Sequence, residues 1–264
     1  MKRFFTLLLS FFILINMSSV AYGTEFNDLD NNAKEILLNI KYTRNILFNL
    51  LGVELTTETF AEEEIKYDGV VYLTFDDGPV AKFTEPILDT LKANNVKATF
   101  FELGQYVNSN PSLTKRVYDE GHTVASHSYS HKKEIYSSFE KFKKEIIDTE
   151  TAIENATGAK PKFFRPPYGY KLPQNYKDFL AERGYEIILW NCESNDSRSG
   201  KLTPEYCLQT VKDTSKNKKE VTVIMHDTYN KQHTVDALQS IIDYFRELNY
   251  EFKQYGSKKW QYGQ

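Results

Sequence analysis

From residue 70 onward, short segments of β-branched and aromatic residues alternate with longer segments of helical periodicity. Alternation of this kind predicts a mainly parallel sheet, because the helix between two strands carries the chain back across the sheet. The predicted strands are 70–76, 98–103, 122–127, 163–166, 186–191, 221–226 and 250–254. The predicted helices are 84–95, 111–120, 137–156, 173–183, 204–216 and 233–248.

The number of strands favours a closed architecture. Seven strands within residues 68–258 fit a (β/α) barrel with one unit fewer than the usual eight. An open doubly wound sheet is the alternative. No glycine-rich phosphate loop follows the first strand, so the sequence gives no support to a nucleotide-binding fold.

The first 23 residues have the features of an export signal. Lys2-Arg3 precedes an apolar run from Phe4 to Met17, and small residues end the segment at Gly23. The run is short for a membrane span, so we expect cleavage and a secreted or cell-surface protein without stable membrane insertion. An uncleaved signal would tether the protein instead.

The remaining chain divides by character into three parts. Residues 24–67 predict a spacer or helical extension with one amphipathic helix, roughly 32–51. Residues 68–258 form the expected catalytic domain, and 259–264 a tail.

Charge and cysteine content exclude several classes of protein. Removing Lys2 and Arg3 moves the net charge from −3 to −5, which gives no bulk attraction for nucleic acid or anionic membranes. The two cysteines, Cys192 and Cys207, belong to no Cys-x-x-Cys pair, so thiolate ligation of zinc is not expected. Whether they form a disulfide stays open. We expect a monomer.

Polar side chains lie at or just beyond the carboxyl ends of five predicted strands. In parallel α/β proteins this is the edge at which ligands bind, so we expect these side chains to meet there. They are Asp76 and Asp77 after the first strand, His127 and His131 after the third, Arg165 at the fourth, Asp196 after the fifth and His226 at the sixth.

Two histidines and a carboxylate predict a metal site. His127 and His131 are four residues apart, a spacing that lets a tight loop aim both imidazoles at one ion. Asp76 and Asp77 are adjacent at a strand end and point different ways, so one can bind the ion while the other faces substrate. The alternative is that Asp-Asp-Gly-Pro is only a polar turn.

Two further segments carry chemistry. The prolines that follow Arg165 predict a stiff turn that holds this guanidinium and the Tyr168 N–H in fixed directions. His226, braced by a carboxylate such as Asp196, is suited to donate a proton to a leaving amine. The remaining two histidines receive no function: we expect a structural hydrogen bond at His122 and a solvated side chain at His233.

Five segments resemble the motifs of the polysaccharide deacetylases, the NodB-homology domain of carbohydrate esterase family 4. The resemblance covers roughly residues 70–254, and the segments follow the family's order. They are Thr74-Phe75-Asp76-Asp77-Gly78, His127-Ser128-Tyr129-Ser130-His131, Arg165-Pro166-Pro167-Tyr168, Glu193-Ser194-Asn195-Asp196 and Ile224-Met225-His226.

The resemblance implies a distorted (β/α)7 barrel and a metal-dependent de-N- or de-O-acetylase. The roles that it implies are Asp76 as catalytic base, Asp77, His127 and His131 as metal ligands, Arg165 as the residue that orients the base, Tyr168 as the donor of a backbone N–H to the oxyanion hole, and Asp196 as the partner of the catalytic acid His226. The fourth motif departs from the family: Glu193 stands where Asp is usual, and Ser197 where an aromatic residue is usual. Ile224 replaces a usual Leu. Ser197 puts the shape of the substrate in doubt more than the chemistry.

We therefore expect a secreted hydrolase that removes acetyl groups from N-acetylglucosamine-type residues, with peptidoglycan ahead of chitin oligosaccharides and acetylated xylan. The expected cofactor is a divalent metal, zinc first, with Co2+, Ni2+ or Mn2+ as alternatives. A phosphatase with strand-end aspartates normally holds magnesium through oxygen ligands, and two histidines argue against it. Two non-enzymatic classes also fit the pattern, a glycan-binding homologue without catalysis and a structural wall protein.

Overall fold

The computed structural model describes residues 66–200 and 202–257. Residues 67–257 belong to one compact unit of the chain. The expected signal at 1–23, the helix at 32–51 and the tail at 259–264 lie outside the described residues. None of the described helices combines the length and the apolar composition that crossing a bilayer requires.

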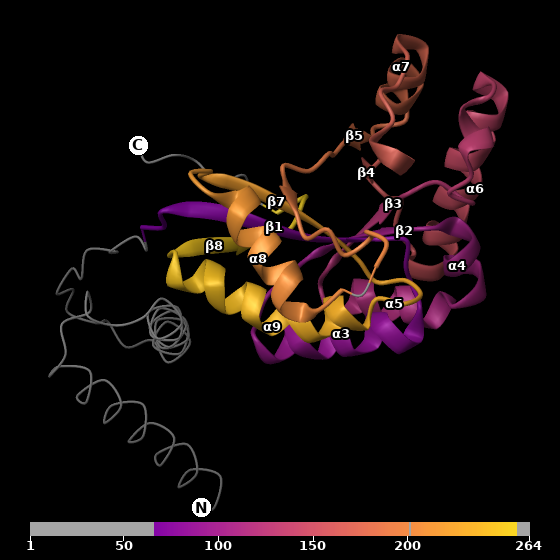
Figure 1. Cartoon of the computed structure of the whole chain (residues 1–264). Helices are drawn as coiled ribbons and strands as arrows, with labels where there is room; N and C mark the ends of the chain where they lie inside the picture. Colours follow the sequence, from indigo (N-terminus) through magenta and orange to yellow (C-terminus); the bar gives the residue numbers. More distant parts are fainter. Residues whose placement is uncertain (1–65, 201, 258–264) are drawn as a thin grey trace, which may run out of the picture. The chain divides into compact units, whose positions relative to one another are not determined.

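A curled parallel sheet forms the centre of this unit (Figure 1). Its strands run in the order β5-β4-β3-β2-β1-β7-β6, with β8 also paired to β1, and every pair is parallel. No ladder within the described residues joins β5 to β6, so the sheet is an opened barrel. The strands are β1 (Gly69–Asp76), β2 (Thr99–Glu102), β3 (Thr123–Ser126), β4 (Phe163–Phe164), β5 (Glu186–Ile187), β6 (Cys192–Glu193), β7 (Glu220–His226) and β8 (Tyr250–Lys253).

Strand β1 is the central strand, and all its residues are buried. It pairs with β7 from Val70 to Asp76, which places Asp76 opposite His226. On its other side, the first half of β1 pairs with β8 and the last three residues with β2. Burial on both faces explains the continuous run of Val, Tyr, Leu and Phe in this strand, which is typical of parallel sheets.

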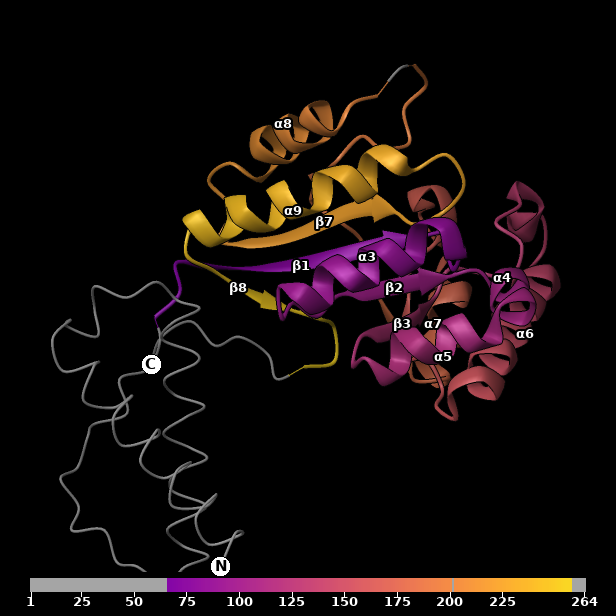
Figure 2. The same ribbon diagram turned by 90° about the horizontal axis from the view of Figure 1, so that it is seen from below.

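Helices cover the sheet as the alternation predicts. Figure 2 shows α3 and α9 running along β1 and β7. Thr203 caps α8 by accepting from the Tyr206 N–H, and Ser138 caps α6 by accepting from the Lys141 N–H. The helices are α3 (Ala81–Ala93), α4 (Gly104–Ser109), α5 (Pro111–Asp119), α6 (Phe139–Thr157), α7 (Gln174–Glu182), α8 (Pro204–Ser215) and α9 (Gln232–Glu247), with 3-10 turns η3 (Lys133–Tyr136) and η4 (Pro167–Gly169).

The largest apolar cluster lies between the sheet and these helices, and both cysteines belong to it. Cys192 and Cys207 are free thiols in the structure, and burial raises the pKa of each to about 11. They are therefore held as inert apolar side chains. A second cluster packs Phe142 and Phe164 against α7.

The predicted parallel α/β sheet is confirmed, but some predicted elements are wrong in extent. The strand predicted at 186–191 is two short strands, β5 and β6, because the chain between them leaves the ladder and turns its carbonyls toward Arg165. The strand predicted at 163–166 ends at Phe164, since the prolines beyond it donate no ladder hydrogen bond. The short helix α4 was not predicted.

Candidate active site

The three predicted metal ligands meet at the carboxyl edge of the sheet. Asp77 follows β1, and His127 and His131 stand on the loop after β3. The Asp77 Oδ1 atom lies 3.5 Å from the His127 Nε2 atom and 3.5 Å from the His131 Nε2 atom. Among the described residues this is the one group of three or more His, Cys, Asp or Glu side chains close enough to hold a metal ion.

The protonation state of His127 suits this side chain to a cation. The His127 Nδ1 atom lies 2.7 Å from the Arg165 carbonyl oxygen, so this nitrogen carries the proton and donates, which leaves the Nε2 lone pair facing Asp77. Burial lowers the pKa of His127 to about 3, so its imidazole is neutral at physiological pH. A neutral imidazole is the form that binds metal.

The donor set also passes a geometric test. Two ligand atoms that each lie about 2.1 Å from a tetrahedral ion are about 3.4 Å apart. The separations of 3.5 Å between Asp77 and the two imidazoles match that spacing and are long for direct hydrogen bonds. The Asp77 Oδ1 atom is buried without a hydrogen-bond partner among the described residues. The three side chains therefore fit a divalent cation, and two nitrogens with one oxygen suit zinc.

The turn that carries Asp77 depends on a glycine. Asp77 has a φ of 71°, which turns the chain sharply out of β1. A Cβ atom on Gly78 would lie 2.2 Å from the Asp227 carboxylate, so no other residue fits there without a shift. The Gly78 carbonyl accepts from the Leu103 N–H, and Asp227 accepts from the Thr84 hydroxyl. These contacts fix the direction in which Asp77 leaves the strand.

Asp76 points away from this turn, toward Arg165. The Arg165 guanidinium is fully buried and donates from one nitrogen to Asp76 Oδ1 at 2.7 Å and to the Thr74 hydroxyl at 2.8 Å. Its remaining nitrogens donate to the carbonyls of Ile188 and Leu189, and its Cζ atom lies 4.0 Å from the centre of the Phe101 ring. A solvated arginine on a surface turn is thereby excluded.

The pKa of Asp76 reflects two opposing effects. Burial raises the pKa above its ordinary value, and the charges of Arg165 and His226 offset part of that rise. A carboxylate with a raised pKa is a stronger base than an exposed aspartate. Its second oxygen, Oδ2, lies 3.7 Å from His127 Nε2, so Asp76 borders the candidate metal site without completing it.

Tyr168 sits in the turn that follows β4, with a φ of 62°. The stiff segment of two prolines places its ring 4.5 Å from the His131 ring, and its hydroxyl donates to the His131 carbonyl at 2.7 Å. Its backbone N–H finds no acceptor within the described residues. This donor is therefore free for a ligand at the edge of the metal site.

His226 and Asp196 form a tight pair at the end of β7. The His226 Nδ1 atom lies 2.7 Å from Asp196 Oδ1, and the His226 backbone N–H donates to Asp196 Oδ2 at 2.7 Å. Burial alone would lower the pKa of His226, but the Asp196 carboxylate and Asp76 raise it to about 9. Burial likewise opposes ionisation of Asp196, yet His226 and Lys231 hold its pKa below the ordinary value. The imidazole is therefore protonated at neutral pH.

The two remaining histidines have different outcomes. His122 Nδ1 accepts from the Ala98 N–H at 3.1 Å, which confirms the expected structural hydrogen bond. The prediction of a solvated His233 is wrong, because its Nε2 atom lies 2.9 Å from the Asp196 carbonyl. The loop after β6 brings that carbonyl back against the start of α9.

Several contributors to the site were missed by sequence reasoning. The Thr234 hydroxyl donates to Asp196, and Phe101 packs under Arg165. Glu145 accepts three hydrogen bonds from residues 127–131, the two-histidine loop. Thr74 stands inside the first of the five motif segments, so that segment was the available signal for its role. Glu145 lies in a charged helical stretch, where nothing distinguishes it from its neighbours.

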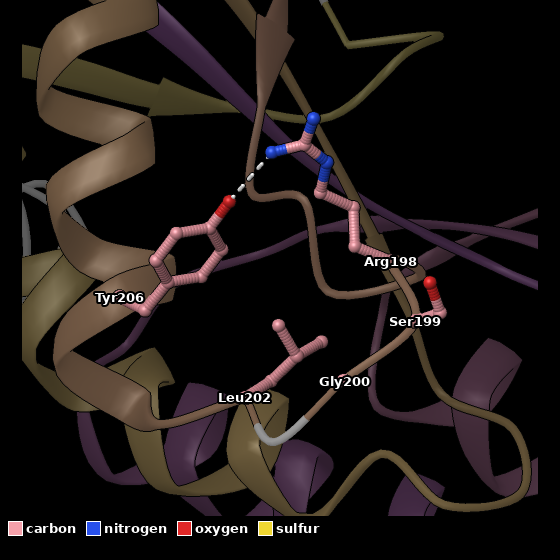
Figure 3. A pocket seen from close by; sticks show the side chains of 5 residues that line it. All are labelled: Arg198, Ser199, Gly200, Leu202 and Tyr206. Carbon is pink, nitrogen blue, oxygen red and sulfur yellow. Dashed lines mark hydrogen bonds between the residues drawn. The ribbon is translucent and has the colours of Figure 1, made fainter.

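A separate pocket lies beside the loop that carries Asp196 (Figure 3). It is lined by Arg198, Ser199, Gly200, Leu202 and Tyr206, and the Arg198 guanidinium donates to the Tyr206 hydroxyl at 3.0 Å. None of these side chains is a carboxylate or an imidazole. The reactive groups therefore lie outside this pocket, around Asp77.

Sequence comparison connects this arrangement to known proteins. Residues 64–188 match the model of the polysaccharide deacetylase family. A peptidoglycan-N-acetylglucosamine deacetylase of Bacillus cereus is 41% identical over 126 residues, which cover 48% of this chain and 46% of that protein. Another deacetylase of that description from Bacillus cereus is 32% identical over 77% of this chain and 94% of its own length. The chain spans less than half the length of the 41% identical relative, and also less than half the length of a peptidoglycan-N-acetylglucosamine deacetylase of Listeria monocytogenes that it matches.

Solved structures agree with these matches. A polysaccharide deacetylase from Bacillus cereus superposes with a TM-score of 0.65 at 34% identity, over 72% of this chain and 93% of that one. A family 4 carbohydrate esterase from Streptomyces lividans gives a TM-score of 0.63 at 32% identity, over 70% and 92% of the two chains. Likeness in sequence and in fold over the region that holds the site leads to one conclusion: the chain belongs to the polysaccharide deacetylase family.

Proposed function

We propose that this protein is a metal-dependent hydrolase that removes acetyl groups from N-acetylglucosamine residues of a polysaccharide, with peptidoglycan as the substrate. One observation carries the proposal. A group of side chains that could hold a cation, a buried carboxylate and a protonated imidazole lie at one edge of the sheet, and metal-dependent amide hydrolysis would use all three. Chitin oligosaccharides and acetylated xylan are the alternative substrates.

Asp77, His127 and His131 would hold the cation, for which zinc suits the donor set and Co2+, Ni2+ or Mn2+ are alternatives. When bound, such an ion polarises a carbonyl and lowers the pKa of water. The three ligands come from only two loops, and the neutral state of His127 means that binding displaces no proton from it.

Asp76 is the proposed base. It would take a proton from the attacking water while Arg165, fixed by its buried contacts, orients the carboxylate. The acetamide carbon gains the water oxygen and becomes tetrahedral, and the Tyr168 N–H would donate to its oxyanion. His226 would then transfer its proton to the sugar nitrogen as the carbon–nitrogen bond breaks, which releases acetate and an amine.

Three tyrosines near the candidate metal site support a sugar substrate. The Tyr168 ring packs 4.5 Å from the His131 ring, and Tyr106 follows Gly104 and Gln105, whose N–H groups donate to the loop between His127 and His131. Tyr229, 60% exposed, packs edge-on against Tyr106 with ring centres 6.0 Å apart. Exposed aromatic faces of this kind suit the apolar faces of sugar rings.

The relatives favour peptidoglycan among glycans. Several that match this chain are described as peptidoglycan-N-acetylglucosamine deacetylases, from Bacillus cereus and Listeria monocytogenes. A bifunctional xylanase/deacetylase of Pseudobutyrivibrio xylanivorans, 32% identical over 85% of this chain, keeps acetylated xylan as an alternative. One solved relative at 28% identity is described as a mutant of a family pseudoenzyme with restored enzymatic activity. Because a family pseudoenzyme exists, a non-catalytic glycan-binding homologue is the second candidate function.

A peptidoglycan substrate also requires a location outside the cell. We propose that residues 1–23 direct export and are removed, that 24–67 form a spacer, and that 68–258 form the catalytic domain, which acts as a monomer in or at the cell wall. The basic start and the apolar run from Phe4 to Met17 support the first part. The match of the family model to residues 64–188 supports the last.

Acetate release from peptidoglycan, chitin oligosaccharides and acetylated xylan, assayed side by side, tests the proposal. We expect the highest kcat/KM on peptidoglycan. Faster release from chitin oligosaccharides would change the proposed substrate and keep amide hydrolysis as the reaction. Faster release from acetylated xylan would change the reaction to ester hydrolysis with an alcohol as the leaving group. Absence of release from all three would exclude the enzyme and favour the glycan-binding homologue.

The pairing of His226 with Asp196 predicts a pH dependence. His226 must be protonated to donate, so activity falls as pH rises through its pKa of about 9. In Asp196→Asn the attraction that raises this pKa is gone, and the alkaline limb of the pH profile of kcat/KM should move about 1 to 3 pH units lower. Asp213→Asn on the exposed face of α8 serves as control, with no shift expected. An alkaline limb that stays in place in Asp196→Asn would contradict the assignment of His226.

A further inference from the structure

The loop that carries the two candidate metal ligands holds an unusual backbone conformation. Ser128 has a φ of 70° and His131 a φ of 55°, values that residues other than glycine adopt only when their surroundings hold them. The Ser128 hydroxyl accepts from the His131 N–H at 3.1 Å, which closes the loop on itself. The direction of both imidazoles depends on this conformation.

The loop is held from two sides. On one side, the N–H groups of Gly104 and Gln105, at the start of α4, donate to the carbonyls of Ser128 and Tyr129 at 3.1 Å each. On the other side, Glu145 of α6 accepts three hydrogen bonds from the loop. Its Oε2 atom accepts from the backbone N–H groups of Tyr129 and Ser130 at 2.8 Å each, and its Oε1 atom accepts from the Ser130 hydroxyl at 2.7 Å.

From these contacts we propose that Glu145 is a positioning residue for the metal site: it holds the loop in the conformation that aims His127 and His131 at one cation. The inference rests on the proposed metal site and adds a residue that acts on the cation only through the loop. A carboxylate suits the task because it accepts at both oxygens, and hydrogen bonds to a charged acceptor are the stronger kind.

The same helix offers a matched control. Glu150 also accepts several hydrogen bonds, from Arg183 at 2.8 and 3.2 Å and from Lys160 at 3.2 Å, and these partners lie away from the two-histidine loop in the sequence. Replacing Glu150 with alanine should lower the thermal stability of the protein. It should leave the metal site as it is, because the contacts of Glu145 with the loop are untouched.

Zinc affinity of the metal-free protein tests the inference without an activity assay. We would titrate Zn2+ against a chromophoric competing chelator with wild type, Glu145→Ala, Glu145→Gln and Glu150→Ala, and confirm folding of each by thermal unfolding. The dissociation constant for zinc should rise about 10- to 100-fold in Glu145→Ala, as for other residues that support metal ligands. It should stay at the wild-type value in Glu150→Ala.

Glutamine at 145 can accept the hydrogen bonds of both backbone N–H groups with its one oxygen. The dissociation constant for zinc of Glu145→Gln should therefore lie between those of wild type and Glu145→Ala, and about 3-fold or more above the wild-type value. This variant carries the test if Glu145→Ala does not fold. Wild-type affinity in a folded Glu145→Ala, or in Glu145→Gln when only that variant folds, would overturn the role of Glu145. Equal weakening in Glu150→Ala would also overturn it. Wild-type protein that binds no zinc would overturn the metal site itself.

Discussion

Asp76→Asn should reduce acetate release by about 10²- to 10⁴-fold, the range that general-base catalysis contributes. The side chain keeps its size and can still accept the hydrogen bond from Arg165, but an amide cannot take a proton from water. Asp76 is buried, and burial raises its pKa toward the range of an effective base. The measurement is kcat/KM for acetate release from a soluble N-acetylglucosamine oligosaccharide.

Two further measurements make this result specific to the base. Asp76→Asn should bind zinc as wild type does, because Asp77, His127 and His131 are unchanged. Its thermal stability should fall, since the buried Arg165 loses a charged partner. An exposed substitution, Asp89→Asn on α3, should leave kcat/KM unaltered. Substantial acetate release by Asp76→Asn would exclude this residue as the base.

His131→Ala should have the second large effect, through the metal. It removes one of three proposed protein ligands. Replacing a residue that only supports a metal ligand lowers metal affinity by up to roughly 100-fold, so zinc affinity should fall by more than that in His131→Ala. His131 is partly exposed, and its removal should disturb folding little. Zinc titration of the metal-free protein gives the affinity, and acetate release should fall in parallel at limiting zinc.

His122→Ala is the matched control for this loss of an imidazole. His122 lies at the opposite end of β3, where it accepts the Ala98 N–H, and its replacement should lower thermal stability without changing zinc affinity. If His131→Ala bound zinc as tightly as wild type, His131 would not be a ligand. An equal loss of zinc affinity in both variants would indicate that lower stability of the fold, and not loss of a ligand, weakens zinc binding.

Much of the architecture follows from the sequence because the long helices and strands have clear residue patterns. The β-branched and aromatic run of β1, ended by Gly-Pro, favours a strand, and the long periodic stretch of α6 favours a helix, and both elements are predicted within a few residues. The break between β5 and β6 was not predictable, because the two strands are only two residues long each and the segment between them serves Arg165 rather than the ladder.

The reactive side chains of the site were predictable because they lie at the carboxyl ends of predicted strands. Asp77, His127 and His131 do meet, since parallel strands bring their carboxyl ends to one edge. The supporting contacts were not predictable. Glu145 reaches the loop from a helix whose sequence carries no mark of that contact, and His233 binds a carbonyl that only the folded chain brings near.

Acetate release as a function of bound zinc tests the central claim most directly. The protein would be stripped with a chelator, reloaded with Zn2+ in steps, and assayed on peptidoglycan, with bound metal measured in the same samples. We predict no release above background without metal and a rise in rate that saturates at one zinc ion per chain. Release that persists in the stripped protein, or a fully loaded protein that releases no acetate, would contradict the proposed metal-dependent hydrolysis.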